Sequence, residues 1–177
     1  MPPRANVYLV GMMGAGKTTV GRLLARRLRL RFIDSDQEIE ARCGVKIPVI
    51  FDIEGEPGFR AREEQVIAEL TALEGVVLAT GGGAVLSEAS RRWLATRGTT
   101  VYLRARPEDL YERVRHDKNR PLLATADPLA RLRRLFAERD ALYGQTAHIV
   151  VDTGAQSVQV LARDLLGKIE ERWKASA

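Results

Sequence analysis

The 177-residue sequence predicts an α/β domain of three layers, with helices on both faces of a five-stranded parallel sheet. Two observations lead to this prediction. First, a glycine-rich segment that contains a lysine lies between a short apolar run and a helical pattern near the N-terminus. Second, short runs rich in Val, Ile and Leu alternate with helical patterns along the whole chain. Such runs, without polar alternation, are typical of parallel strands that are covered on both faces.

The first strand is expected at 6–10 and the first helix at 16–28. Between them, Gly11–Thr18 matches the pattern G-x-x-x-x-G-K-[ST] at every fixed position. The glycines let the backbone turn its N–H groups toward a polyphosphate, and the helix N-terminus adds favourable partial charge. Lys17 would reach the β- and γ-phosphates, and the Thr18 hydroxyl would bind a magnesium ion. We therefore expect a nucleoside triphosphate site; a glycine-rich turn with a chance lysine is the alternative.

The second strand, expected at 31–34, is followed by a helix at 36–43. Asp34 and Asp36 come at the end of this strand, where ligands of open parallel sheets lie. One carboxylate would lie near magnesium through water, and the other would accept the proton of an attacking hydroxyl. The alternative is that Ser35 or Asp36 only caps the helix that follows.

Prolines and glycines predict a broken helical stretch at 44–60, which is followed by a helix at 60–73 and a strand at 76–80. Beyond this strand lie three consecutive glycines: Gly81, Gly82 and Gly83. Their N–H groups carry no side chains, so a ligand can approach the backbone closely. A tight turn is the alternative for these glycines.

The C-terminal half repeats the alternation of helices and strands. Helices are expected at 87–97, 107–116, 128–142 and 156–173, and strands at 99–103 and 147–151. Ser87 and Gly98 flank the first of these helices, and Pro107 and Pro128 stand near first turns. The polar, basic loop at 117–127 is long enough to be a movable cover that excludes water from a reaction. A plain surface connection is the alternative.

Composition limits the class of protein without deciding it. The length suits one domain, and Cys43 is the only cysteine, so no internal disulfide forms and a reducing cytosol fits. No apolar run approaches the length of a membrane span, and no secretory segment precedes the first strand. The net charge of +5 would suit a nucleic-acid binder. A kinase for ATP and an anionic acceptor needs converging cations as well.

Three arginines are candidates for anion binding, namely Arg60, Arg120 and Arg139. Guanidinium groups bind carboxylates and phosphates in a planar, bidentate way. Spacing alone does not single these three out from the other arginines. His116 and His148 show no metal-ligand spacing, so structural roles are expected for both.

In this order, the segments resemble the shikimate kinase family over nearly the whole chain. The matching segments are the phosphate loop, Asp34-Ser35-Asp36, Ile50-Phe51, Gly55-Glu56, Phe59-Arg60 with Glu63, Gly81-Gly82-Gly83, Arg120-Pro121-Leu122-Leu123, and Arg139 with Leu142-Tyr143. Many NTPases share the phosphate loop, but the ordered combination is far more specific.

The resemblance implies ATP-dependent phosphorylation of the shikimate 3-hydroxyl, which gives shikimate 3-phosphate and ADP on the route to chorismate and aromatic amino acids. It implies a P-loop NTPase fold with strand order 2-3-1-4-5, as in nucleoside monophosphate kinases. It also implies a single domain, 1–177, with a substrate-binding excursion at about 36–63 and a mobile lid at about 117–127. A cytoplasmic monomer that uses Mg²⁺ and has neither nucleic acid nor membrane as a partner is expected.

The resemblance also implies roles for individual residues. Asp36 would hold the shikimate hydroxyls and serve as the base, Arg60 and Arg139 would bind the carboxylate, and Gly82 would bind through its backbone, flanked by Gly81 and Gly83. Arg120, on the lid, would contact the transferring phosphates. Thr18 would bind magnesium, with Asp34 in the water shell of the ion. ATP would be held by Gly14, Ala15, Gly16, Lys17, Thr18, Thr19, Arg113 and Arg120.

Two places differ from the pattern of the family. Pro48 stands where a helix former is expected, so the start of that helix would be displaced. Some relatives have a basic residue after strand five near the adenine, but 154–157 contains none. Arg113 and Arg115 are both candidates for the other side of the base, and the sequence does not choose between them.

Other classes of function stay open at this point. The nearest alternative is a kinase for gluconate or a nucleoside monophosphate, and gluconate also combines a carboxylate with hydroxyls. A nucleotide acceptor would need a second base site, for which the glycine segment offers little stacking surface. A non-catalytic ATP switch or a nucleic-acid-binding NTPase is supported only by the basic charge and the phosphate loop.

Overall fold

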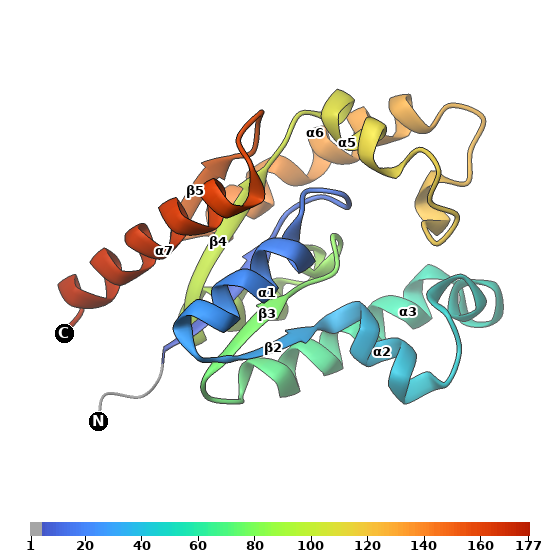
Figure 1. The fold of residues 1–177 in the computed structure, drawn as a ribbon. Coiled ribbons are helices and arrows are strands. Elements are labelled where there is room, and N and C mark those ends of the chain that lie inside the picture. The colour runs from blue at the N-terminus through green and yellow to red at the C-terminus, as the bar shows by residue number, and fades with distance from the viewer. Residues whose placement is uncertain (1–4) are drawn as a thin grey trace.

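A parallel sheet with strand order β2-β3-β1-β4-β5 runs through the middle of the protein (Figure 1). The computed structural model describes residues 5–177. Its strands are β1 (Asn6–Val10), β2 (Arg31–Asp34), β3 (Val76–Ala79), β4 (Gly98–Arg104) and β5 (Ile149–Asp152). All four neighbouring pairs are parallel. The predicted fold class and strand order are confirmed.

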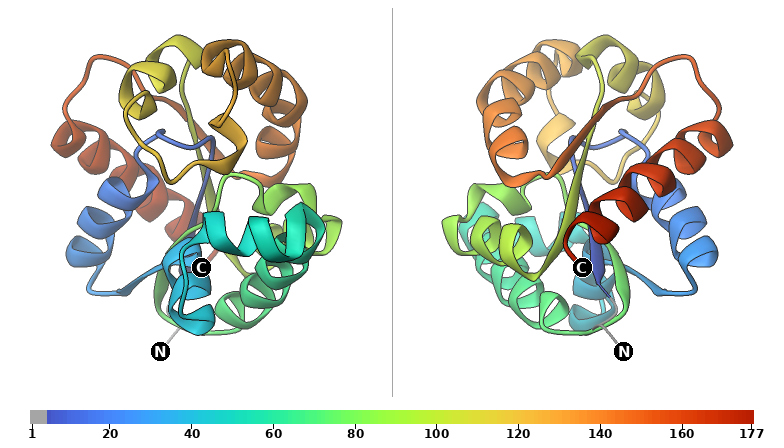
Figure 2. Two further views of the ribbon diagram at one scale, coloured as in Figure 1. Left: turned by 90° about the vertical axis from the view of Figure 1, so that its right-hand side faces the viewer. Right: turned by 90° about the vertical axis from the view of Figure 1, so that its left-hand side faces the viewer.

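Helices cover both faces of the sheet. They are α1 (Lys17–Leu28), α2 (Ser35–Cys43), α3 (Ile47–Thr71), α4 (Glu88–Arg97), α5 (Pro107–Val114), α6 (Pro128–Thr146) and α7 (Val158–Ala175), with 3-10 turns η1 (Ala84–Leu86) and η2 (Pro121–Leu123). In Figure 2, α1 and α7 lie on one side of the sheet, and α3, α4 and α6 lie on the other. The central strand β1 is buried along its whole length because both layers cover it.

The register of the strands brings the polar segments together at one edge of the sheet. Ala79 pairs with Leu9 on one side and with Asp34 on the other. The chain therefore leaves β1, β2 and β3 at nearly the same level, and Gly11, Ser35 and Thr80 follow there. This is the carboxyl edge of the sheet, where ligands bind in open α/β folds.

The segment predicted as a broken helical stretch is the first half of α3. This helix begins at Ile47, and Pro48 occupies its first turn, where a missing N–H costs no hydrogen bond. The regular backbone is interrupted at Gly55, which has φ 69° and ψ 179°, and the helix then continues to Thr71. The sequence predicted that Pro48 would displace the start of this helix. In the structure, Pro48 instead lies within the first turn.

The predicted lid connects α5 to α6. In Figure 1 it extends from the top of the molecule toward α3, and η2 contacts α3 and α6. Throughout residues 5–177, no helix combines the length and the apolar character that crossing a membrane requires.

Candidate active site

The phosphate loop connects β1 to α1 with backbone angles that favour glycine. Gly14 and Gly16 have φ values of 79° and 96°, a region that side-chain-bearing residues rarely adopt. A Cβ on Gly14 would also lie 2.6 Å from a methyl carbon of Val114. The first turn of α1 contains no acidic residue, so its N–H groups and dipole are free to attract an anion.

Lys17 begins α1 and its side chain turns back over the loop. Its Nζ donates hydrogen bonds to the carbonyl oxygens of Gly11, at 2.6 Å, and Met12, at 2.8 Å. Burial and the neighbouring Arg120 lower the pKa of Lys17 to about 8, although Asp36 and Asp34 oppose this change. The ammonium group is therefore held in place but poorly neutralised, as a site for a polyphosphate requires.

Asp34 has two roles in the structure. Its Oδ1 accepts a hydrogen bond from the N–H of Gln37, at 3.1 Å, so Asp34 is the N-cap of α2. Its Oδ2 accepts a hydrogen bond from the Thr18 hydroxyl, at 2.8 Å. The alternative that Ser35 or Asp36 caps this helix is wrong, because the cap lies one residue earlier. The Ser35 hydroxyl instead accepts a hydrogen bond from the Gly81 N–H, at 2.9 Å.

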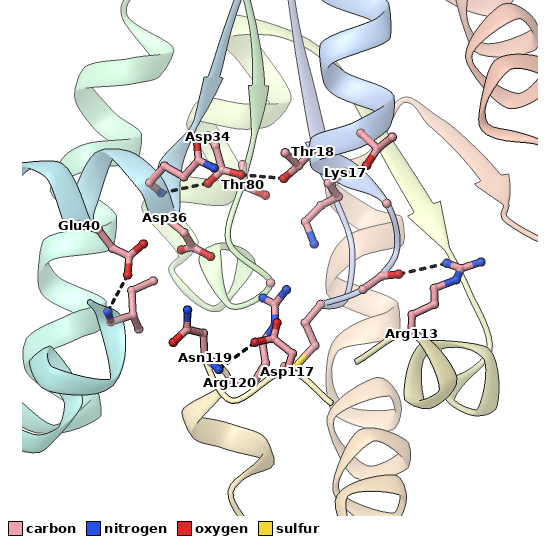
Figure 3. Close-up of a pocket in the computed structure, with 17 residues that line it drawn as sticks. Lys17, Thr18, Asp34, Asp36, Glu40, Thr80, Arg113, Asp117, Asn119 and Arg120 are labelled. Carbon is pink, nitrogen blue, oxygen red and sulfur yellow. Dashed lines mark hydrogen bonds and ion pairs between the residues drawn. The ribbon is translucent and has the colours of Figure 1, made fainter. Parts of the chain in front are cut away.

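A cavity of about 490 Å³ opens beside these residues (Figure 3). In the close-up, Asp34 and Asp36 extend from the segment that begins α2, Lys17 and Thr18 extend from the start of α1 beside them, and Arg120 extends from the lid side. The cavity is lined by Met13, Gly14, Gly16, Lys17, Thr18, Thr19, Asp34, Asp36, Gln37, Glu40, Ile47, Thr80, Gly82, Arg113, Asp117, Asn119 and Arg120.

Asp36 lies in this cavity with an unusually basic carboxyl group. Burial raises its pKa to about 7, and the nearby carboxylates of Glu63 and Asp34 add to this effect. The positive charges of Lys17 and Arg120 oppose it. A carboxyl group with a pKa near neutrality is suited to accept a proton from a hydroxyl.

A second hollow of about 60 Å³ adjoins the large cavity, and both are lined by Asp36, Gly82 and Arg120. The rings of Phe51 and Phe59 form an apolar wall, with centroids 4.9 Å apart. The remaining lining residues are Met13, Ile47, Arg60, Glu63, Gly83, Asn119, Pro121, Leu122 and Arg139.

Two arginines line this hollow, and they differ in whether carboxylates of the protein pair with them. Arg60 pairs with the buried Glu63, at 2.8 Å, and with the more exposed Glu56, at 3.3 Å. Arg139 is only 3% exposed, and within the described residues its Nε and NH1 atoms have no hydrogen-bond partner. Burial raises the pKa of Glu63, although Arg60 and Arg139 oppose the rise. A buried guanidinium with unpaired donors is costly unless an anion binds it.

Most of the residues that the sequence singled out line one of these two spaces. Ala15 lines a separate hollow of about 230 Å³ between the phosphate loop and the segment after β5, together with Thr19 and Arg113. The NH1 group of Arg113 donates a hydrogen bond to the Gly14 carbonyl, at 3.1 Å, whereas Arg115 pairs with Glu112. The structure thus places Arg113, rather than Arg115, against the phosphate loop.

Gly81 lines neither space, and its N–H donates a hydrogen bond to the Ser35 hydroxyl. It leaves room for two carboxylates, since a Cβ there would lie 2.6 Å from Asp36 Oδ1 and 2.7 Å from Glu63 Oε2. Sequence reasoning gave no role to Glu63. The spacing of three residues from Arg60 on a helix could have indicated the ion pair.

The fold and the site define a P-loop kinase for a small anionic acceptor. A strand, a glycine-rich loop and a helix N-terminus form a phosphate site. A basic hollow with two buried or half-buried guanidinium groups adjoins it.

Comparisons with known proteins identify the acceptor. The shikimate kinase family model matches residues 13–170. A shikimate kinase of Thiobacillus denitrificans is 63% identical over 170 residues, which cover 96% of this chain and 93% of the relative. The structure of an Acinetobacter baumannii shikimate kinase in complex with shikimate is 48% identical, with a TM-score of 0.93 and coverage of 95% and 94%. A Sinorhizobium meliloti gluconokinase, covering 98% of each chain at 18% identity and a TM-score of 0.55, shares the fold alone.

The chain therefore belongs to the shikimate kinase family. It is an enzyme of the shikimate pathway that phosphorylates shikimate, and its kinase activity implies ATP as the phosphoryl donor.

Proposed function

We propose that this enzyme transfers the γ-phosphoryl group of ATP to the 3-hydroxyl of shikimate, at the junction of the two spaces described above. The observation that carries the proposal is their shared wall. Asp36 and Arg120 line both spaces, Lys17 of the phosphate loop lines one, and Arg139 lines the other. A donor phosphate and an acceptor hydroxyl bound in these spaces would meet beside Asp36.

On the donor side, we assign the polyphosphate to the loop and to the first turn of α1. The residues are Gly14, Ala15, Gly16, Lys17, Thr18 and Thr19. Arg113 would lie along the base or the ribose, because its guanidinium already contacts the loop at Gly14. Arg120 would contact the transferring group from the lid, where Asp117 holds its Nε at 3.1 Å.

We assign Mg²⁺ to the pair formed by Thr18 and Asp34. Both supply hard oxygen atoms, which are joined by a 2.8 Å hydrogen bond at the wall of the large cavity. Mg²⁺ usually keeps several waters and takes few protein ligands besides substrate phosphates, so two such groups fit. When bound, the ion neutralises charge that develops on the phosphates. Asp34 would hold it through water while it still caps α2.

On the acceptor side, we assign the shikimate carboxylate to Arg60 and Arg139. Arg139 has free donors in a buried hollow, and Arg60 lies over Gly83, where any Cβ would overlap its guanidinium. Gly82 offers backbone contacts, and Gly81 and Gly83 leave space for the charged side chains. Asp36 would hold the hydroxyls and accept the proton of the attacking one.

We further propose that residues 1–177 act as one domain, with a substrate-binding excursion at about 36–63 and a lid at about 117–127. The enzyme would work as a monomer in the cytoplasm, and nucleic acids and membranes would have no part in the reaction. Size-exclusion chromatography with light scattering tests the monomer, and addition of DNA or RNA to the kinase assay tests the nucleic-acid alternative.

A coupled ADP-release assay across shikimate, quinate, gluconate and nucleoside monophosphates tests the proposed acceptor. Turnover is expected with shikimate far above the others, and NMR of the product should place the phosphate on the 3-hydroxyl. Comparable turnover with gluconate, or a phosphate on another hydroxyl, would contradict the assignment of the acceptor hollow.

A further inference from the structure

The fully buried side chain of Tyr143, on α6, reaches the glycine segment after β3. Its hydroxyl donates a 2.5 Å hydrogen bond to the carbonyl oxygen of Gly82. The ring of Tyr143 packs against the ring of Tyr102 on β4, with centroids 4.9 Å apart. Both rings are almost completely excluded from solvent. The hydroxyl of Tyr143 is therefore the point at which α6 is tied to the glycine segment.

The Gly82 peptide lies between the two halves of the site. A Cβ placed on Gly82 would lie 3.4 Å from the Met13 nitrogen of the phosphate loop and 3.7 Å from NH1 of Arg139. Any rotation of this peptide would thus move the wall that separates the phosphate site from the acceptor hollow. The hydrogen bond from Tyr143 fixes one end of it.

Tyr143 also stands next to the arginine that has unpaired donors. Arg139 and Tyr143 are four residues apart on α6, so they share one face of the helix. Burial raises the pKa of Tyr143 to about 12, while the nearby positive charge of Arg139 opposes the rise. The hydroxyl thus stays protonated and donates to Gly82.

We propose that Tyr143 is a positioning residue for the acceptor: its hydroxyl fixes the Gly82 peptide beside the Arg139 guanidinium, and so sets the affinity for the substrate carboxylate. The proposal rests on the assignment of Arg139 to that carboxylate. Tyr143 lines neither space, so it acts through its two neighbours.

Tyr102 offers a matched control. Its ring is equally buried, and its hydroxyl donates a 2.8 Å hydrogen bond to Asp140, which also binds Arg104. Tyr102→Phe therefore removes one buried hydroxyl from the same pair of rings, but it leaves the contact with Gly82 intact. A general effect on packing would appear in both variants.

The test compares Tyr143→Phe with Tyr102→Phe in steady-state kinetics. Loss of one hydrogen bond beside a charged group should raise the KM for shikimate about 10-fold in Tyr143→Phe. The KM for ATP should stay within about twofold, and Tyr102→Phe should change neither KM by more than about twofold. Equal changes in both KM values, or equal changes in the two variants, would overturn the proposal.

Comparing kcat/KM for shikimate with kcat/KM for its methyl ester distinguishes positioning of the carboxylate site from a general structural role of Tyr143. Because the ester lacks the carboxylate charge, Tyr143→Phe should lower kcat/KM for shikimate far more than for the ester. An equal loss with both substrates would overturn the proposal. The carboxylate assignment itself fails if the unmodified enzyme and Arg139→Ala both use shikimate and the ester with similar kcat/KM. That result differs from an equal loss in Tyr143→Phe, so the two failures can be told apart.

A variant with 4-aminophenylalanine at position 143 keeps a donor in the same place. It should restore the KM for shikimate to within about threefold of the unmodified enzyme. It also provides a folded protein for the comparison if Tyr143→Phe melts below the assay temperature. A 10-fold higher KM for shikimate despite this donor would overturn the role of the hydrogen bond.

Discussion

Asp36→Asn separates the contribution of a charged carboxylate to catalysis from its cost to stability. The substitution keeps the size of the side chain and one carbonyl acceptor, but it removes the charge and the capacity to accept a proton usefully. We expect turnover to fall about 10²-fold or more, because both orientation of the hydroxyls and proton removal are lost. The KM for ATP should change little. Full activity of Asp36→Asn would show that the acceptor site lies elsewhere.

The same substitution should stabilise the fold above neutral pH. The pKa of Asp36 rises from 3.8 to about 7 on folding. Between these values the native state holds a proton that the unfolded state has lost, so the free energy of unfolding falls as the pH rises. The full difference corresponds to about 4 kcal/mol, and water in the open cavity should reduce it to about 1–2 kcal/mol.

Thermal unfolding at two pH values measures this effect. At pH 8, Asp36→Asn should melt about 2–6 °C above the unmodified enzyme, and the difference should disappear toward about pH 4, where Asp36 is protonated in both states. Asp34→Asn is the matched control, because Asp34 is partly exposed and caps α2. A lower melting temperature for Asp36→Asn at pH 8 would refute the reasoning about burial.

The pH profile of kcat/KM gives a second measurement on the same residue. In the proposed mechanism, transfer needs an ionised Asp36 and a protonated Lys17, and the pKa values of these groups are about 7 and about 8. The profile of the unmodified enzyme should therefore be bell-shaped, with apparent pKa values that belong to the coupled pair. Asp36→Asn should lose the acid limb. Its alkaline limb should move to lower pH, because Asp36 no longer raises the pKa of Lys17.

Other substitutions and one exchange experiment test the remaining assignments. Lys17→Met should lower turnover about 10²–10³-fold in a folded protein, and near-normal turnover would remove Lys17 from the mechanism. Asp34→Asn should chiefly raise the Mg²⁺ concentration needed for half-maximal activity, and an unchanged Mg²⁺ dependence would contradict the metal assignment. Arg139→Lys should weaken shikimate binding about as much as Arg139→Ala, because lysine keeps the charge but loses the planar fork; rescue by lysine would mean that charge alone suffices. Hydrogen exchange over 117–127 should slow when ATP and shikimate are both present, and equal exchange with and without them would argue against closure of the lid.

The sequence predicted the fold correctly, and the phosphate loop could be located from the sequence as well, because both depend on local patterns. The phosphate loop needs glycines at fixed spacing, and the parallel strands need unbroken apolar runs, so each can be recognised within a few residues. The first half of α3 was predicted only as a broken stretch. Pro48 has two meanings, as a helix breaker or as a first-turn residue, and only the neighbouring structure decides between them.

The acceptor half depends on contacts between distant segments, which no local pattern contains. Tyr143 meets Gly82 across 61 positions of sequence. Glu63 is a charged residue on a buried helix face. It forms an ion pair with Arg60, and it fits there because Gly81 has no side chain. A single sequence predicts that such residues are helical. It does not predict which partner each of them finds after the helices have packed against the sheet.

Several charged groups of the site are poorly neutralised by the protein itself, so bound substrates would supply the missing partners. Burial and like charges lower the pKa of Lys17 and raise that of Asp36, so the charged form of each is disfavoured in the enzyme alone. Among residues 5–177, Nε and NH1 of the buried Arg139 find no hydrogen-bond partner. A polyphosphate would favour the ammonium of Lys17, and an acceptor carboxylate would pair with Arg139, so each substrate removes a cost that the folded protein bears without it. A neutral polyol with the same hydroxyls would leave Arg139 unpaired. If the acceptor carboxylate binds Arg139 as proposed, its charge, more than its hydroxyl pattern, would determine which class of molecule this hollow binds.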